Sequence, residues 1–163
     1  MTIAVGDTLP NATFRVMTPE GPAVRTTDEV FKGRKVVLFA VPGAFTPTCH
    51  KNHLPGFVAR IDEFKAKGVD AVVCTSTNDV FVLKAWADQV GASGTIEFLS
   101  DGNADFAKAI GLSMDSSGFG LGTRSRRYSM LVDDGVVKRL NIEEAAGKAD
   151  LSGADTLLTQ MAE

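Results

Sequence analysis

The chain has 163 residues, 44% of them hydrophobic and 23% charged, and its 17 basic and 20 acidic residues give a net charge of −3 at pH 7. This length suits one domain with a sizeable core, so we expect a single domain over residues 1–163. Because the chain has neither an excess of basic residues nor an apolar run near the roughly 20 residues of a spanning helix, we expect no nucleic-acid partner and no membrane insertion.

The first half of the chain predicts strands on either side of one long helix. Residues 13–17 and 23–26 predict a short pair of strands, because a turn-forming Pro-Glu-Gly-Pro segment separates them. Residues 36–41 are continuously apolar, which indicates a buried central strand. The helix that follows has its apolar residues at helical spacing and ends at Gly68, and Pro55 inside it predicts a kink near that turn.

The second half predicts further strand–helix units, a hairpin and a closing helix. The predicted strands cover residues 69–75, 96–99, 128–132 and 136–140, and a short helix covers residues 104–110. Asn78 is the predicted N-cap of a helix between the first two strands, and Asp133-Asp134-Gly135 is a hairpin turn. Ser152 and Asp155 predict the cap of the terminal helix. This order predicts an α/β fold of thioredoxin-like type, with a central mixed sheet flanked by helices on both faces.

The most informative segment is Pro42-Gly43-Ala44-Phe45-Thr46-Pro47-Thr48-Cys49, which follows the strand over residues 36–41 and opens the long helix. Thr46 suits the N-cap and Pro47 the first helical position, which places Cys49 in the first turn. Unpaired N–H groups and the positive end of the helix dipole stabilise an anion there. We therefore expect the Cys49 thiol to ionise more readily than a free thiol.

Other side chains can complete a reactive site around this thiol. Pro42 and Phe45 supply an apolar wall that limits water, and the Thr46 hydroxyl can donate to the thiolate or to an oxygen bound beside it. A fixed positive charge must come from Arg124, Arg126 or Arg127. We favour Arg127, because it adjoins the predicted strand that begins at residue 128 and is therefore the most rigidly held.

The pattern Pro42-x-x-x-Thr46-x-x-Cys49 resembles that of the peroxiredoxins, which are thiol peroxidases with a thioredoxin-like fold. The full string from Pro42 to Cys49, followed by Asn-His-Leu-Pro-Gly-Phe over residues 52–57, is similar to their type II branch, the class of the atypical two-cysteine enzymes. Further matches are Val5-Gly6-Asp7, Asn78-Asp79, Ala85-Trp86-Ala87 and Arg126-Arg127-Tyr128-Ser129-Met130. The resemblance covers essentially the whole chain.

The resemblance implies a peroxidase that reduces hydrogen peroxide and alkyl hydroperoxides, with Cys49 as the peroxidatic cysteine that becomes a sulfenic acid. It implies that Thr46 and Arg127 orient the O–O bond and that Pro42 shields the sulfenate. The residues expected to line the peroxide pocket are Gly43, Phe45 and Phe119. It further implies a homodimer formed through the active-site edge, and a reaction that uses an external thiol but no metal or prosthetic group.

Cys74 is the only internal thiol that can clear a sulfenic acid at Cys49. Buried cysteines also act as small hydrophobic residues, and Cys74 ends a predicted buried strand. In plant-type members of the family a cysteine at the matching position is regarded as resolving, whereas animal members carry theirs late in the chain, where this sequence has none. A disulfide needs Cα atoms within roughly 7 Å. We therefore favour glutaredoxin, glutathione or thioredoxin as the reductant, with Cys74 as the possible resolving thiol.

Alternative interpretations rest on weaker patterns. Cys49-His50-x-x-His53 suggests a metal cluster, but adjacent residues of a helix do not share a face, so both histidines are expected to be solvated or capping residues. A disulfide oxidoreductase is disfavoured because the chain has no C-x-x-C motif. A non-catalytic redox sensor or thiol-dependent binding module would keep Cys49 reactive without turnover.

The expected location is the cytoplasm. Two cysteines do not form a disulfide framework, which indicates a reducing compartment. The first residues, Met1-Thr2-Ile3-Ala4-Val5-Gly6-Asp7, have neither the basic end nor the apolar core of a signal peptide. An organelle protein that has lost its targeting segment would look the same.

Overall fold

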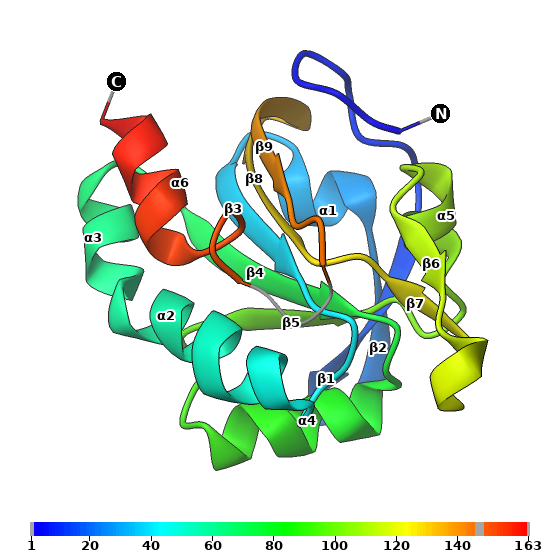
Figure 1. Cartoon of the computed structure of the whole chain (residues 1–163). Helices are drawn as coiled ribbons and strands as arrows, with labels where there is room; N and C mark the ends of the chain where they lie inside the picture. The colour runs from blue at the N-terminus through cyan, green and yellow to red at the C-terminus, as the bar shows by residue number, and fades with distance from the viewer. Residues whose placement is uncertain (1, 146–148, 163) are drawn as a thin grey trace.

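The computed structural model describes residues 2–145 and 149–162, and its centre is a mixed sheet of seven strands (Figure 1). These strands are β1 (Thr13–Thr18), β2 (Gly21–Thr26), β3 (Lys35–Ala40), β4 (Ala71–Ser76), β5 (Glu97–Ser100), β8 (Tyr128–Asp133) and β9 (Val136–Ile142). Their order in the sheet is β2-β1-β5-β4-β3-β8-β9. A separate two-stranded sheet pairs β6 (Ser113–Asp115) with β7 (Thr123–Ser125).

The register confirms the two predicted strand pairs, β1 with β2 and β8 with β9, and shows how the other strands join them. β3 runs parallel to β4, and β4 runs parallel to β5, whereas β8 is antiparallel to both β3 and β9. The hairpin between β8 and β9 turns through Asp134 and Gly135, with φ values of 49° and 80°. Two successive positive φ angles define the turn that matches strand twist, which is why an Asp-Gly pair occupies it. Because β3, β4 and β5 run in the same direction, their carboxyl ends lie at the same edge of the sheet, and the chain leaves β3 at that edge.

Helices cover both faces of the sheet, as predicted (Figure 1). They are α1 (Thr27–Phe31), α2 (Leu54–Ala59), α3 (Ile61–Ala66), α4 (Val80–Gln89), α5 (Asp105–Ala109) and α6 (Ala154–Met161). One core cluster joins α1 and α5 to alternate residues of β3, such as Leu38. The other joins α2, α3, α4 and α6 to the intervening residues, such as Phe39, and it contains both Cys49 and Cys74. Thus β3 is buried on both sides, which explains its continuous apolar run.

The predicted long helix is divided into three pieces. A π-helical turn covers Cys49–His53, α2 begins at Leu54, and the chain breaks at Arg60 before α3. The kink expected near Pro55 stays a prediction: Pro55 lies in the first turn of α2, where a missing N–H is tolerated, and the irregular π-helical turn directly precedes it. Pro55 affects the preceding turn, because in an ordinary α-helix its ring clashes with the carbonyl four residues earlier. In that turn the Leu54 N–H donates to the carbonyl of Cys49, five residues earlier, which is the π-helical pattern.

Two predicted caps were wrong. Asp79, not Asn78, is the N-cap of α4, and its side chain accepts from the Val82 N–H at 2.8 Å. Gly153 precedes α6 without a side-chain cap, and Ser152 turns inward. Both polar side chains that were expected to cap helices bond elsewhere, near Cys49, as described below.

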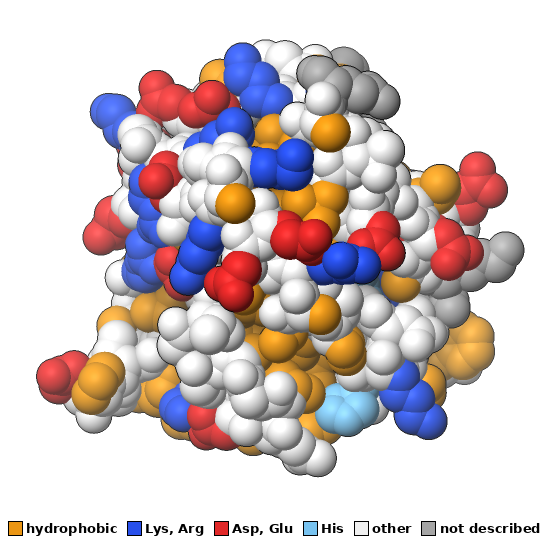
Figure 2. Space-filling model, turned by 90° about the vertical axis from the view of Figure 1, so that its left-hand side faces the viewer, with side chains coloured by type: hydrophobic (Ala, Val, Ile, Leu, Met, Phe, Trp, Pro, Cys, Tyr) orange, Lys and Arg blue, Asp and Glu red, His pale blue; other side chains and the backbone are white. Residues whose placement is uncertain are grey.

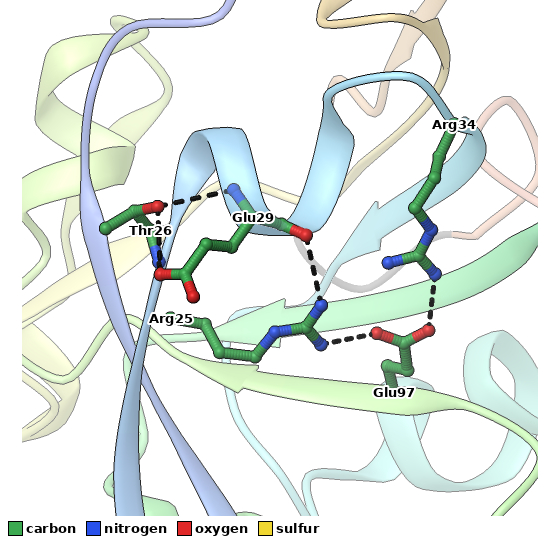
Figure 3. A network of polar contacts seen from close by, with 5 residues as sticks. All are labelled: Arg25, Thr26, Glu29, Arg34 and Glu97. Atoms are coloured by element: carbon green, nitrogen blue, oxygen red, sulfur yellow. Dashed lines mark hydrogen bonds and ion pairs between the residues drawn. The ribbon is translucent and has the colours of Figure 1, made fainter.

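A polar network ties the other end of the sheet together (Figure 3). Glu97, which begins β5, accepts from Arg25 of β2 at 2.7 Å and from Arg34, just before β3, at 2.6 Å. Although partial burial acts to raise it, these hydrogen bonds hold the pKa of Glu97 below its usual value. The capping box of Thr26 and Glu29 starts α1 beside this network. The network lies at the amino ends of β3 and β5, so it fixes the scaffold without touching the Cys49 end.

Figure 2 shows the face formed by α2, α3 and α6, with charged side chains gathered in its upper half and hydrophobic ones in its lower half. The partly buried residues that pack on the core cluster of Cys49 include Val58, Val82, Val90 and Phe98.

No helix within the described ranges is both long enough and apolar enough to cross a lipid bilayer.

Candidate active site

The loop from Pro42 to Thr46 follows the carboxyl end of β3, where ligands of α/β sheets commonly bind. Its first residues, Pro42 and Gly43, are buried. The Ala44 N–H donates to Asn78 Oδ1 at 2.7 Å, and Phe45 has a positive φ of 64°. The predicted helix cap Asn78 therefore holds this loop, and a side chain from the end of β4 sets the conformation of residues 42–46.

Gly43 is required for the close approach of its neighbours. A Cβ atom at this position would lie 3.1 Å from the Thr46 methyl carbon and 3.2 Å from Arg124 Nη1. The Gly43 carbonyl also accepts from the Thr46 hydroxyl at 2.6 Å. Thr46 thus uses its proton on the loop, rather than on the sulfur as anticipated, and presents its lone pairs as acceptors. Its own carbonyl accepts from the His50 N–H at 2.8 Å, which begins the turn of Cys49.

Cys49 and Arg127 meet inside the protein. Cys49 is 0% exposed and Arg127 is 3% exposed, and Arg127 Nη2 donates to Cys49 Sγ at 2.9 Å. A guanidinium is always charged, so it stabilises a thiolate at this distance. Arg127 directly precedes β8, as the sequence argument required. The two groups are 78 residues apart in the chain and are joined only by the fold.

His53 is the functional residue that the sequence analysis misjudged. It is 1% exposed rather than solvated, its Nδ1 lies 3.0 Å from Arg127 Nη1, and its Nε2 lies 2.9 Å from the Ser152 carbonyl oxygen. A guanidinium only donates and a carbonyl only accepts, so the proton of His53 is on Nε2 and Nδ1 is the acceptor. His53 follows Cys49 by four residues, and this spacing on one helical face was the signal that could have identified it.

Ser152 and Glu143 support His53 from behind. Glu143, buried after β9, accepts from the Ser152 N–H at 2.8 Å and from its hydroxyl at 2.6 Å. Although burial acts to raise it, hydrogen bonds from Ser152 and Leu151 keep the pKa of Glu143 below its usual value. A continuous series of contacts therefore runs from Glu143 through Ser152, His53 and Arg127 to the Cys49 sulfur.

His50 is not solvated either. Its Nδ1 accepts from the Trp86 indole N–H at 2.9 Å, and its ring stacks on Phe45 with a centroid distance of 5.9 Å. Trp86 is fully buried, as expected for a core residue. These contacts connect the first residue after Cys49 to α4 and place Phe45 beside the turn.

The remaining predicted pocket residue, Phe119, and the candidate cation Arg124 lie on the segment before β8. Phe119, in the short 3-10 turn of Ser117–Phe119, is 87% exposed and forms no buried wall in a single chain. Arg124 lies at the edge of the loop, where its Nη1 donates to the Pro42 carbonyl at 3.3 Å.

Cys74 is buried on β4 beside Phe39 of β3, on the same face of the sheet as Cys49. Both cysteines are free thiols. Burial, and then the negative charge of Cys49, raises the pKa of Cys74 well above its ordinary value, although Arg127 acts in the opposite direction. A thiol that stays protonated is a poor nucleophile, so Cys74 is a weak candidate for attack on Cys49 in the folded protein.

Because His53 is buried, we expect the folded protein to lose stability in acid. Burial first, and then the charge of Arg127, lowers the pKa of His53 to about 3. Unfolded histidine takes up a proton near pH 6.5, so the stability that His53 contributes is present above that pH and is lost as the pH falls towards 3. One pKa unit corresponds to about 1.4 kcal/mol, so the full loss amounts to several kcal/mol.

We expect His53→Asn, which keeps an acceptor for Arg127 but does not titrate, to flatten this acid slope. The measurement is the free energy of unfolding by denaturant titration at pH values between 4 and 7, compared with the wild-type protein. The slope is the readout, because the substitution also changes stability at neutral pH. A slope equal to that of the wild type would show that His53 does not titrate on unfolding.

Comparisons with known proteins identify similar chains. The Redoxin family model matches residues 4–158. The chain is 51% identical over 162 residues to the chloroplastic peroxiredoxin-2E-2 of Oryza sativa subsp. japonica, covering 96% of this chain and 72% of that protein. It is 45% identical over 157 residues to peroxiredoxin-2C of the same plant, covering 96% of both. The crystal structure of reduced Prx3 from Vibrio vulnificus in complex with hydrogen peroxide superimposes with a TM-score of 0.93 at 51% identity, covering 98% of this chain and 99% of that one.

Proposed function

This chain belongs to the peroxiredoxin family of thiol-dependent peroxidases, and from that premise we propose that Cys49 is the thiol that attacks the peroxide. One observation carries the proposal: Arg127 Nη2 lies 2.9 Å from Cys49 Sγ, and both side chains are buried. The other thiol, Cys74, has no such donor among the described residues and its pKa is raised. The structure of the loop over residues 42–46 also supports it, because this loop leaves acceptor lone pairs of Thr46 beside the turn of Cys49.

The proposed step is a displacement at oxygen. The Cys49 thiolate forms a bond to the terminal oxygen of the peroxide, which keeps its hydrogen, and the O–O bond breaks. The leaving hydroxide or alkoxide takes up a proton and becomes water or an alcohol, and the sulfur becomes a sulfenic acid. Thr46 accepts the peroxide O–H, while Arg127 stabilises the charge that moves from sulfur to oxygen. The thiol supplies both electrons, so the step uses no metal or prosthetic group.

We propose that an external thiol, from glutaredoxin with glutathione or from thioredoxin, completes the cycle. Its sulfur displaces water from the sulfenic acid to form a mixed disulfide, and a second thiol then releases Cys49 as a thiol and leaves with the first as a disulfide. The burial of Cys74 and its raised pKa support this assignment over an internal disulfide. The homodimer and the cytoplasmic location stay predictions.

The test is NADPH-coupled peroxide turnover by the wild type and Cys74→Ser, with the glutaredoxin–glutathione and thioredoxin systems side by side. We expect Cys74→Ser to retain turnover within about twofold. In the described part of the chain, no hydrogen bond joins Cys74 to Arg127 or to the loop over residues 42–46. Dimedone added with one equivalent of peroxide should label Cys49, as located by mass spectrometry. Loss of turnover in Cys74→Ser with a disulfide between Cys49 and Cys74 would make Cys74 the resolving thiol. A sulfenic acid at Cys49 without turnover in either system would favour the redox sensor.

A further inference from the structure

Arg124, on β7, places a second positive charge against the loop over residues 42–46. Its Nη1 donates to the Pro42 carbonyl at 3.3 Å, and its Nε donates to the Leu121 carbonyl at 2.8 Å. The absence of a side chain on Gly43 gives this guanidinium its space, since a Cβ there would lie 3.2 Å from Nη1. Arg124 is therefore held in a fixed position over the first two residues of the loop, while Arg127 occupies the interior.

The charge of Arg124 is not neutralised by a carboxylate within the described part of the chain. Its contacts there are the two backbone carbonyls, which engage two of the five N–H groups of a guanidinium. By contrast, Arg25 and Arg34 bond to Glu97, and Arg60 to Glu63 and Asp155. Carbonyl oxygens carry only partial charges, so Arg124 keeps both its positive charge and donors for a further acceptor.

Two exposed apolar residues belong to the segments that Arg124 contacts or adjoins. Leu121, whose carbonyl accepts from Arg124, is 38% exposed, and Phe45, two residues after Gly43, is 42% exposed. Large exposed apolar groups beside a preorganised cation suit a molecule that has an apolar chain and one anionic end. A planar guanidinium fits a carboxylate better than other common anions of comparable size, apart from phosphate.

We propose that Arg124 binds the carboxylate of an alkyl hydroperoxide whose O–O group reacts at Cys49, an inference that rests on the function proposed above. The apolar chain of this substrate lies against Phe45 and Leu121, and its anionic end bonds to the free N–H groups of Arg124. Arg124 is then a specificity-determining residue: it distinguishes carboxylate-bearing hydroperoxides from neutral ones.

The experiment compares two probes of equal length: a short tertiary alkyl hydroperoxide with a terminal carboxylate and its neutral N-methylamide. Reduced protein is mixed with each, and loss of the Cys49 thiol in a single turnover gives the rate constant. We expect the wild type to react about fivefold faster with the carboxylate, the size of a partly exposed ion pair. The ratio of the two rates is the readout, so a general loss of activity in a variant cancels.

Three variants test the role of Arg124. In Arg124→Gln the ratio should fall to about one, Arg124→Lys should keep part of the preference, and added salt should reduce it in the wild type. The matched control is Lys32→Gln, which removes an equal charge from an exposed residue just after α1, near the amino end of β3, and should leave the ratio unchanged.

A ratio near one in the wild type, or the same ratio in Arg124→Gln, would overturn the proposal. The proposal would also be overturned if the preference for a carboxylate appeared only when oxidised Cys49 is reduced. The rates of reduction by mercaptopropionate and by mercaptoethanol make that comparison. Failure of this inference is distinct from failure of the proposed function: in the first case hydrogen peroxide and the amide still oxidise Cys49, and in the second neither does.

Discussion

Replacing Cys49 by serine is expected to lower peroxide turnover by at least about a thousandfold, the scale seen when an enzyme loses its nucleophile. A serine hydroxyl is not ionised at neutral pH, so the donor from Arg127 at 2.9 Å has no anion to stabilise and no thiolate to aim at the O–O bond. The measurement is the second-order rate constant for hydrogen peroxide with saturating reductant.

Cys74→Ser is the matched control for this change, because it makes the same substitution at the other buried cysteine. Thermal unfolding of both variants separates a lost nucleophile from a lost fold. If Cys49→Ser retained more than a few per cent of the turnover while folding normally, the attacking thiol would have to be Cys74, and the assignment of the site would be wrong.

Replacing Arg127 by glutamine should reduce kcat/KM for hydrogen peroxide by about a hundredfold to a thousandfold, the usual effect of removing one preorganised donor from a developing charge. Arg127→Lys should recover little of this loss. Arginine reaches Cys49 Sγ with Nη2 and His53 Nδ1 with Nη1 at once, whereas an ammonium is a single point of charge without that fork.

Arg126→Gln provides the comparison for the neighbouring position. Arg126 is half-buried and donates to the Glu143 carbonyl at 3.3 Å, but none of its described hydrogen bonds involves Cys49 or His53. We expect its kcat/KM to stay within about threefold of the wild type. Equal losses in the two variants would point to general positive charge, rather than the placed donor of Arg127, as the source of rate acceleration.

The parts of the fold that depend on local pattern were predictable. The continuous apolar run gave β3, the Asp-Gly turn identified the β8–β9 hairpin, and alternation of strands and helices led to the thioredoxin-like class. The choice of Arg127 over Arg124 and Arg126 also succeeded in placing a guanidinium on Cys49. It rested on physical rigidity, because a residue next to a central strand has little freedom to move.

The parts that depend on where distant segments meet were not predictable. Asn78 has the residue type of a helix cap, yet its side-chain Oδ1 accepts from the Ala44 N–H, because the fold brings the end of β4 beside the loop. The burial of His53 could not be predicted, because it depends on the segment after β9, which places the Ser152 carbonyl against the His53 ring. Sequence gives the donors and acceptors, whereas their partners are decided by tertiary packing.

Pro55 also weakens the backbone connection between α2 and the turn that carries Cys49. It has no N–H, so it donates no hydrogen bond back into the turn over Cys49–His53, and α2 is joined to that turn by the bond from the Leu54 N–H to the Cys49 carbonyl. The free-energy cost of opening residues 49–53 includes that backbone bond, the buried contacts of Cys49 and His53 with Arg127, and the contact between His50 and Trp86. A sulfur that is 0% exposed in the folded state can thus become accessible to a bulky protein thiol while the sheet and the neighbouring helices keep their structure.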